Sequence, residues 1–129
     1  DNRTDYFAFA DLDPVFDFYT PVIIANNTFL AEEPETARAF LDAVSRGYEF
    51  AIEHPREAGE ILCKAAPELD PDLVKASQEY LADKYQADAP QWGYIDQERW
   101  DAYYAWLNEK GLTETPIEAG TGCSNEYLP

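Results

Sequence analysis

The chain has 129 residues, enough for one domain with a hydrophobic core. Hydrophobic residues make up 46% of it and aromatic residues 15%, a composition that disfavours intrinsic disorder. Its 9 basic and 26 acidic residues give a net charge of -17, which disfavours nucleic acid and anionic lipid as partners because both require positive surface. The sequence contains no Met, so we expect a processed chain or a piece of a longer one.

Two short segments near the start have the composition of β-strands. Tyr6–Ala10 is aromatic and precedes turn residues at Asp13 and Pro14. Val22–Ala25 is mostly β-branched and uninterrupted by polar residues, as is typical of a strand buried on both faces. Since two short strands do not form a stable sheet alone, we expect them to pair with other elements.

From Pro34 onward the sequence predicts four helices. The first lies between Pro34 and Pro55, with apolar residues spaced i, i+3, i+4 and i+7. Its predicted inward face consists of Ala37, Phe40, Leu41, Val44, Tyr48, Ala51 and Ile52. The other three are predicted over residues 55–66, over residues 71–85, and from the N-cap Asp96 to a Schellman stop at Gly111. Short connections predict antiparallel neighbours in a compact bundle.

The fourth predicted helix carries an aromatic stripe that the same periodicity assigns to packing. Its inward positions are Trp100, Tyr103, Tyr104 and Leu107. The tail from Thr113 onward contains Pro116, Gly120 and Gly122 and is expected to be irregular.

The sequence offers no recognisable catalytic group. His54, the single histidine, lies at a helix end before Pro55, where a structural role is favoured. No Ser or Cys lies in a nucleophile motif. Cys63 and Cys123 match no metal-ligand spacing; a free thiol at Cys63 is the ordinary expectation, with a disulfide between the two as the alternative.

Carboxylates near the start resemble a cation site only superficially. Asp11, Asp13 and Asp17 alternate through a turn, but the glycine and the closing glutamate of a calcium loop are missing. We therefore predict no metal site.

A better candidate for ligand binding is the aromatic segment from Phe16 to Thr20. It combines flat apolar faces with a carboxylate and two hydroxyl groups, a mixture that can stack on a planar ligand and hydrogen-bond its edge. The alternative, which composition alone favours, is that Phe16 and Phe18 belong to the core.

Several segments resemble the NMT1/THI5-like family, the thiamine-precursor-binding group of solute-binding proteins. The matching segments are Phe29–Pro55, Pro67–Asp70 with Leu73 and Val74, Trp92–Asp96 with Trp100, and Ser124–Pro129. Together they make the resemblance specific, and it extends from Pro14 to Pro129. It is a similarity to the C-terminal portion of such a protein.

The resemblance implies a fold class, namely an α/β periplasmic-binding-protein type II fragment. This fragment would be mainly α-helical, with four helices and two short N-terminal strands. Residues 1–27 would contain the lobe-crossover strands and the end of the second lobe. Residues 28–129 would form the C-terminal helical part of the first lobe.

The resemblance also implies a ligand site at Asp17, Phe18, Tyr19 and Thr20. The corresponding family segment lies at the ligand cleft and tends to read Asp-Tyr-Tyr-Glu. Carried over by position, Phe18 and Tyr19 would face the ligand, and Thr20 would replace an acidic group. A hydroxyl accepts hydrogen bonds more weakly than a carboxylate and carries no charge. An aminopyrimidine ligand is therefore disfavoured, and another aromatic or small organic solute is favoured.

The function implied is that of the solute-binding component of an ABC importer, located outside the cytoplasm as a periplasmic protein or a cell-surface lipoprotein. The expected partners are the membrane permease and a small planar heterocyclic or organic solute, such as a thiamine pyrimidine precursor. We expect no catalysis, no cofactor and no nucleic acid. Unpaired strand edges would also favour a dimer or a strand swap.

Two alternatives stay open at this point. One is a free-standing helical interaction domain. The other is a relative of pyrimidine-precursor synthases, which would require pyridoxal phosphate and a reactive arrangement of His and Cys.

Overall fold

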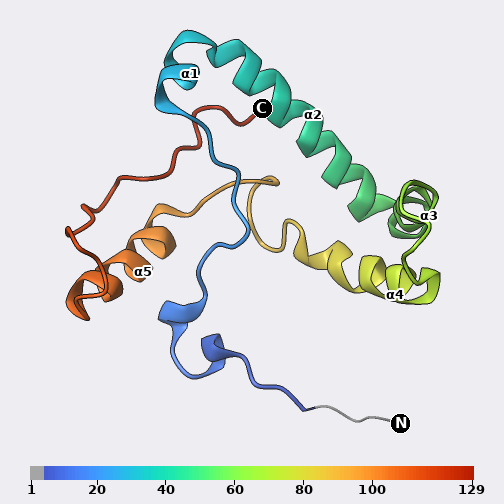
Figure 1. Cartoon of the computed structure of the whole chain (residues 1–129), viewed down its shortest axis with the longest axis horizontal. Helices are drawn as coiled ribbons and strands as arrows, with labels where there is room; N and C mark the ends of the chain where they lie inside the picture. Colours follow the sequence, from blue (N-terminus) through green and yellow to red (C-terminus); the bar gives the residue numbers. More distant parts are fainter. Residues whose placement is uncertain (1–4) are drawn as a thin grey trace. The chain divides into compact units, whose positions relative to one another are not determined.

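The computed structural model describes residues 5–129 (Figure 1). Its α-helices are α1 (Asn27–Glu32), α2 (Pro34–Glu53), α3 (Pro55–Ala65), α4 (Pro71–Leu81) and α5 (Gln97–Glu109). Short 3-10 helices are η1 (Phe9–Asp11), η2 (Pro14–Phe16) and η3 (Ala82–Lys84). The chain forms two compact units, one of Asp1–Ile24 with Ile95–Asn125 and the other of Ala25–Tyr94 with Glu126–Pro129. The assignment of residues 1–27 and 28–129 to two lobes stays a prediction.

The predicted α/β class is wrong for the described part of the chain. Residues 5–129 contain helices and irregular segments but no strand. The predicted strand Tyr6–Ala10 gives way to η1, and Val22–Ala25 is irregular. A β-branched run becomes a strand only where a neighbouring strand satisfies its backbone groups, and no such neighbour exists within residues 5–129. Ile24 accordingly remains 88% exposed.

The larger unit begins with two helices separated by one residue. The side chain of Asn26 accepts a hydrogen bond from the Thr28 amide at 2.8 Å and so caps α1, a helix that the sequence had not predicted. Pro34 is the first residue of α2, as predicted. Ala37 and Ser45 are the buried residues of α2, whereas Phe40, predicted to face inward, is 55% exposed.

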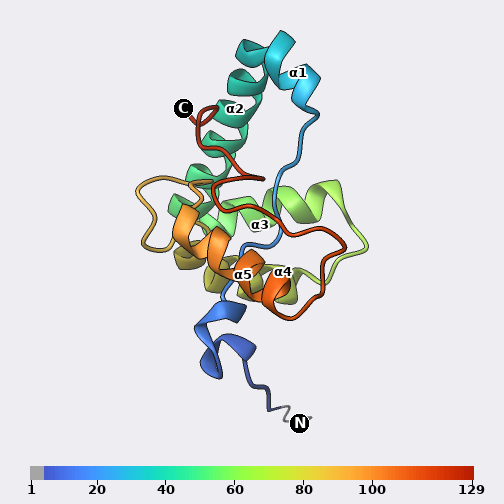
Figure 2. The same cartoon turned by 90° about the vertical axis from the view of Figure 1, so that its left-hand side faces the viewer.

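Helices α3 and α4 contact each other closely through a small residue. Gly59 of α3 is buried, and a Cβ placed on it would lie 3.4 Å from Cγ1 of Val74 in α4. Figure 1 looks along α3 and shows α4 from the side, whereas Figure 2 shows α3 from the side, so the two helices cross and do not run antiparallel. The predicted antiparallel arrangement is therefore wrong for α3 and α4. Among residues 5–129 only Ala37, Val74 and Ala82 are buried hydrophobic side chains.

Helix α5 is the only α-helix of the smaller unit within residues 5–129, and both of its ends match the prediction. The Asp96 carboxylate accepts a hydrogen bond from the Arg99 amide at 2.8 Å, as an N-cap does. At the other end the Leu112 amide donates to the Leu107 carbonyl at 3.0 Å, and Gly111 has a φ of 64°. This is the Schellman motif.

The irregular tail after α5 is held by polar side chains of that helix. Asn108 donates to the Ile117 carbonyl at 2.8 Å and accepts from the Ile117 amide at 3.0 Å and the Thr113 hydroxyl at 2.9 Å. About two turns earlier in the helix, both carboxylate oxygens of Asp101 accept from the Gly120 amide at 3.0 Å. Side-chain hydrogen bonds thus take the place of regular secondary structure in the tail.

Replacing Gly47 by Ala is predicted to stabilise the larger unit. Gly47 lies inside α2, and a Cβ added there meets no atom within 4 Å. Alanine therefore gains about 0.5–1 kcal/mol of helix propensity without a clash. Urea unfolding measures the gain. As a matched control, Gly111→Ala is expected to lose about 1 kcal/mol because its φ is left-handed; a destabilised Gly47→Ala variant would contradict the prediction.

Replacing Asn108 by Ala is predicted to destabilise the smaller unit by about 1–3 kcal/mol. The substitution removes the half-buried Asn108 amide, which is the hydrogen-bond partner of both the amide and the carbonyl of Ile117. Asn108→Asp is the matched variant: it retains an acceptor and lacks the amide donor, so its loss is expected to be smaller. Hydrogen exchange of residues 113–120 and urea midpoints measure both effects. Equal stability of Asn108→Ala and the unmodified protein would refute the proposed hold on the tail.

Candidate functional site

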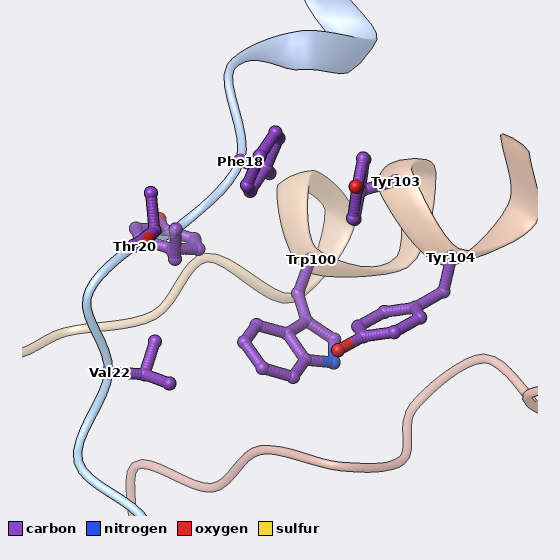
Figure 3. Close-up of a pocket in the computed structure, with 7 residues that line it drawn as sticks. Phe18, Thr20, Val22, Trp100, Tyr103 and Tyr104 are labelled. Carbon is purple, nitrogen blue, oxygen red and sulfur yellow. The ribbon is translucent and has the colours of Figure 1, made fainter. Parts of the chain in front are cut away.

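A pocket of about 190 Å³ lies in the smaller unit, between the segment after η2 and helix α5 (Figure 3). It is lined by Phe18, Tyr19, Thr20, Val22, Trp100, Tyr103 and Tyr104. Five of these seven residues are aromatic, and none carries a charge. Pockets that enclose drug-sized ligands measure roughly 300–1,000 Å³, so this one suits a small ring or part of a larger ligand.

The first aromatic pair of the pocket brings together residues far apart in the sequence. The rings of Phe18 and Tyr103 are stacked, with centroids 4.2 Å apart and an interplanar angle of 19°. Figure 3 shows the two rings facing each other from the segment and from α5. Phe18 remains 37% exposed, so its position combines packing with access from solvent.

A second aromatic pair lies along the same helix. Trp100 and Tyr104 have ring centroids 5.2 Å apart. The indole Nε1 of Trp100 donates to the Thr121 carbonyl at 3.0 Å, which fixes the ring against the tail. A Cβ on Gly122 would lie 3.4 Å from this indole nitrogen, and Gly122 has a φ of 84°, so glycine permits the close passage.

Tyr19 enters the pocket wall with its hydroxyl anchored. The hydroxyl oxygen accepts a hydrogen bond from the Asp96 amide at 2.9 Å, and the Arg99 guanidinium lies 4.4 Å from the ring centroid. Arg99 also binds Asp17: its Nη2 is 2.6 Å from a carboxylate oxygen, and its Nε donates to the Asp17 carbonyl. The neighbouring Thr20–Pro21 peptide bond is cis.

Three of the four predicted ligand-binding residues line the pocket, and the fourth does not. Phe18, Tyr19 and Thr20 are lining residues, whereas Asp17 pairs with Arg99. Their role toward a ligand stays a prediction. Sequence reasoning missed the opposite wall, made by Trp100, Tyr103 and Tyr104, because their helical spacing was interpreted as packing alone.

Other candidates of the sequence have local structural partners. Asp13 accepts from the Val15 amide at 3.0 Å and caps η2. His54 separates α2 from α3, and its ring packs on Phe50 at 5.0 Å. Residues 5–129 contain no group of three or more His, Cys, Asp or Glu side chains that would hold a metal ion.

Cys63 and Cys123 are both free thiols in the structure. The Cys123 thiol lies 3.4 Å from the Gln97 side-chain oxygen. Burial raises the pKa of the Cys123 thiol above its ordinary value, with a smaller contribution from the Asp101 carboxylate. A raised pKa disfavours the nucleophilic thiolate at neutral pH.

Within the described residues, no helix combines the length and the apolar character needed to cross a bilayer.

The sequence was then compared with known proteins. Residues 1–58 match the family model described as NMT1/THI5 like. The formylaminopyrimidine-binding protein of Halalkalibacterium halodurans is 29% identical over 102 residues, which cover 76% of this chain and 31% of the relative. The riboflavin-binding protein RibY of Chloroflexus aurantiacus is 24% identical over 125 residues, covering 89% and 34% respectively.

A third relative has an enzyme's name. The 4-amino-5-hydroxymethyl-2-methylpyrimidine phosphate synthase of Candida albicans is 38% identical over 116 residues, covering 86% of this chain and 31% of the relative. The chain thus spans about a third of the length of these curated relatives. The family-model match and the named relatives confirm the resemblance of this chain to the NMT1/THI5-like family.

Proposed function

We propose that the protein binds a planar, uncharged heterocyclic solute and that the pocket of the smaller unit contributes to the binding surface. The observation that carries this proposal is the aromatic lining: the stacked Phe18 and Tyr103 rings and the Trp100 indole present flat apolar faces beside hydroxyl groups. Such faces stack on aromatic rings, while hydroxyl groups hydrogen-bond a ring's edge.

The printed names of the relatives support the same class of ligand. They refer to a formylaminopyrimidine, riboflavin and a pyrimidine phosphate, each of which contains a flat nitrogen heterocycle. We further propose that the protein acts as the solute-binding component of an ABC importer, outside the cytoplasm, with a membrane permease as its partner. The family resemblance supports this role.

Thr20 bears on which heterocycle is bound. The family resemblance placed an acidic group at this position, and here a hydroxyl side chain lines the pocket. Without a carboxylate, an exocyclic amine loses its strongest acceptor. The proposal therefore favours riboflavin-like rings over aminopyrimidines.

Calorimetric titration of the purified protein tests the proposal directly. The probes are riboflavin, formylaminopyrimidine and 4-amino-5-hydroxymethyl-2-methylpyrimidine, with thermal shift as an independent readout. Saturable binding of at least one probe is expected. The absence of heat and of thermal shift with all three would overturn the proposed binding role.

A synthase is the second candidate because the Candida albicans relative is a named enzyme. Within the described residues, however, His54 contacts Phe50 and Glu53, and no hydrogen bond joins it to a cysteine. Mass spectrometry after incubation with pyridoxal phosphate decides between the two roles. Formation of the pyrimidine phosphate would favour the synthase.

Loss of a flat ring face is predicted to weaken binding. Phe18→Leu and Tyr103→Leu keep apolar volume and remove the stacking surface, so each is expected to lower affinity for the bound probe by about tenfold, within the ~1–3 kcal/mol that base–aromatic stacking contributes. Phe40→Leu is the matched control, because Phe40 is 55% exposed in the other unit. An equal effect in all three variants would argue against stacking in the pocket.

A phosphate group on the ligand is predicted to weaken binding. The lining is uncharged, the neighbouring Arg99 is already paired with Asp17, and the chain carries -17, so a phosphorylated ring meets net repulsion. Riboflavin 5′-phosphate should bind about three- to tenfold more weakly than riboflavin at low salt, and screening should narrow the difference as salt rises. Tighter binding of the phosphate would contradict an uncharged ligand class.

A further inference from the structure

Arg99 makes three contacts to the segment that forms one wall of the pocket. Its Nη2 lies 2.6 Å from the Asp17 carboxylate, its Nε donates to the Asp17 carbonyl, and its guanidinium lies 4.4 Å from the Tyr19 ring centroid. A guanidinium can do this because its planar fork binds two acceptors while its face stacks on an aromatic ring. These contacts involve the backbone and side chain of Asp17 and the side chain of Tyr19.

The contacted segment is not held by regular secondary structure. Helix η2 ends at Phe16, and residues 17–24 have no regular secondary structure. Arg99, in contrast, is the third residue of α5, and its amide donates to the capping carboxylate of Asp96 at 2.8 Å. The Asp96 amide in turn donates to the Tyr19 hydroxyl at 2.9 Å. The irregular segment is thus bound to the N-terminus of α5 through two residues, Arg99 and Asp96.

The location of Arg99 on α5 links these contacts to the pocket. Trp100 follows it directly in the sequence, and Tyr103 lies one turn further along the helix. When Arg99 holds Asp17 and Tyr19, the intervening Phe18 ring stacks on Tyr103 and Thr20 lines the pocket. The two pocket walls are therefore placed relative to each other by a residue that does not line the pocket.

Solvent exposure argues against a mainly global role for this ion pair. The side chains of Arg99 and Asp17 are 39% and 61% exposed. Exposed ion pairs contribute little to global stability, whereas a charged fork with fixed geometry strongly restricts local conformation. The expected consequence of losing it is a disordered pocket wall in an otherwise folded protein.

We propose that Arg99 is a positioning residue for the aromatic pocket, holding residues 17–20 in the conformation that binds solute. This inference rests on the proposed function for its ligand, and its structural part is testable without one. The inference predicts that the planar geometry of the Arg99 guanidinium, and not its positive charge alone, orders residues 17–20.

Hydrogen exchange of the Asp96 amide in the purified protein provides the ligand-independent test, because the acceptor of this amide is the Tyr19 hydroxyl of the held segment. Arg99→Ala is expected to accelerate exchange of the Asp96 amide by about tenfold, which corresponds to about 1.4 kcal/mol. Arg99→Lys keeps the positive charge without the planar guanidinium, so it should restore only part of the protection. Arg46→Ala is the matched control, since Arg46 pairs with Asp42 at 3.2 Å in the other unit. Equal exchange of the Asp96 amide in Arg99→Ala and Arg46→Ala would overturn the inference, as would full rescue by Lys.

Calorimetric titration with riboflavin tests the second part. Arg99→Ala should weaken binding at least as much as Phe18→Leu does, while its thermal midpoint without ligand stays close to that of Arg46→Ala. Unchanged affinity in Arg99→Ala would overturn the positioning role and leave the proposed function standing. If the unmodified protein does not respond to riboflavin or to the pyrimidine probes, the proposed function fails, and the exchange measurement still decides whether Arg99 orders the segment.

Discussion

Residues 17–20 hold their place against α5 through side chains, and the pocket depends on this attachment. Apart from the Asp17 amide, which donates to the Pro14 carbonyl at the end of η2, the segment has no helical or sheet hydrogen bonding. It is held by a stacked ring pair, Phe18 with Tyr103, and by the Arg99 contacts to Asp17 and Tyr19. Stacking of Phe18 on Tyr103 supplies apolar contact, whereas the Arg99 guanidinium fixes the orientation of the segment through directional hydrogen bonds. Neither interaction therefore substitutes for the other.

The same aromatic contact continues beyond the pocket. Trp106 lies edge-on to Phe16 at 5.2 Å and parallel to Tyr103 at 6.2 Å, and Phe16 extends the contact to Phe9 at 5.8 Å. These rings connect η1 and η2 to α5. No residue of α5 is fully buried in this unit. Aromatic side chains are suited to this because each contributes a large contact area at a small cost in side-chain entropy.

The sequence predicted the features that depend on neighbouring residues. The N-cap at Asp96, the proline at the start of α2 and the Schellman motif at Gly111 are all present, because capping needs only a few adjacent positions. The strand prediction at Val22–Ala25 failed because strand formation depends on a partner that the local sequence does not specify. Helix α1 was not predicted, because the segment directly before it was interpreted as a strand, whereas the side chain of Asn26 caps a helix.

The site was predictable in one half only. The family resemblance identified the segment that contains Phe18, Tyr19 and Thr20, all of which line the pocket. The opposite wall comes from Trp100, Tyr103 and Tyr104, some eighty positions away, and periodicity describes only which side of a helix they share. The same aromatic stripe both packs on the segment and lines the pocket. This double role depends on the tertiary contact, so the local sequence does not reveal it.

Composition had left open whether the aromatic residues of segment 16–20 belong to a core or to a ligand surface, and the structure separates two of them. Phe16 is half-buried against Trp106 and lies outside the pocket lining. Phe18, two residues later, lines the pocket and stays 37% exposed although it has a stacking partner. An exposed aromatic face has an unfavourable free energy in water that a flat solute removes on binding. Phe18, whose ring is only partly covered by stacking on Tyr103, is therefore better suited than Phe16 to bind a ligand.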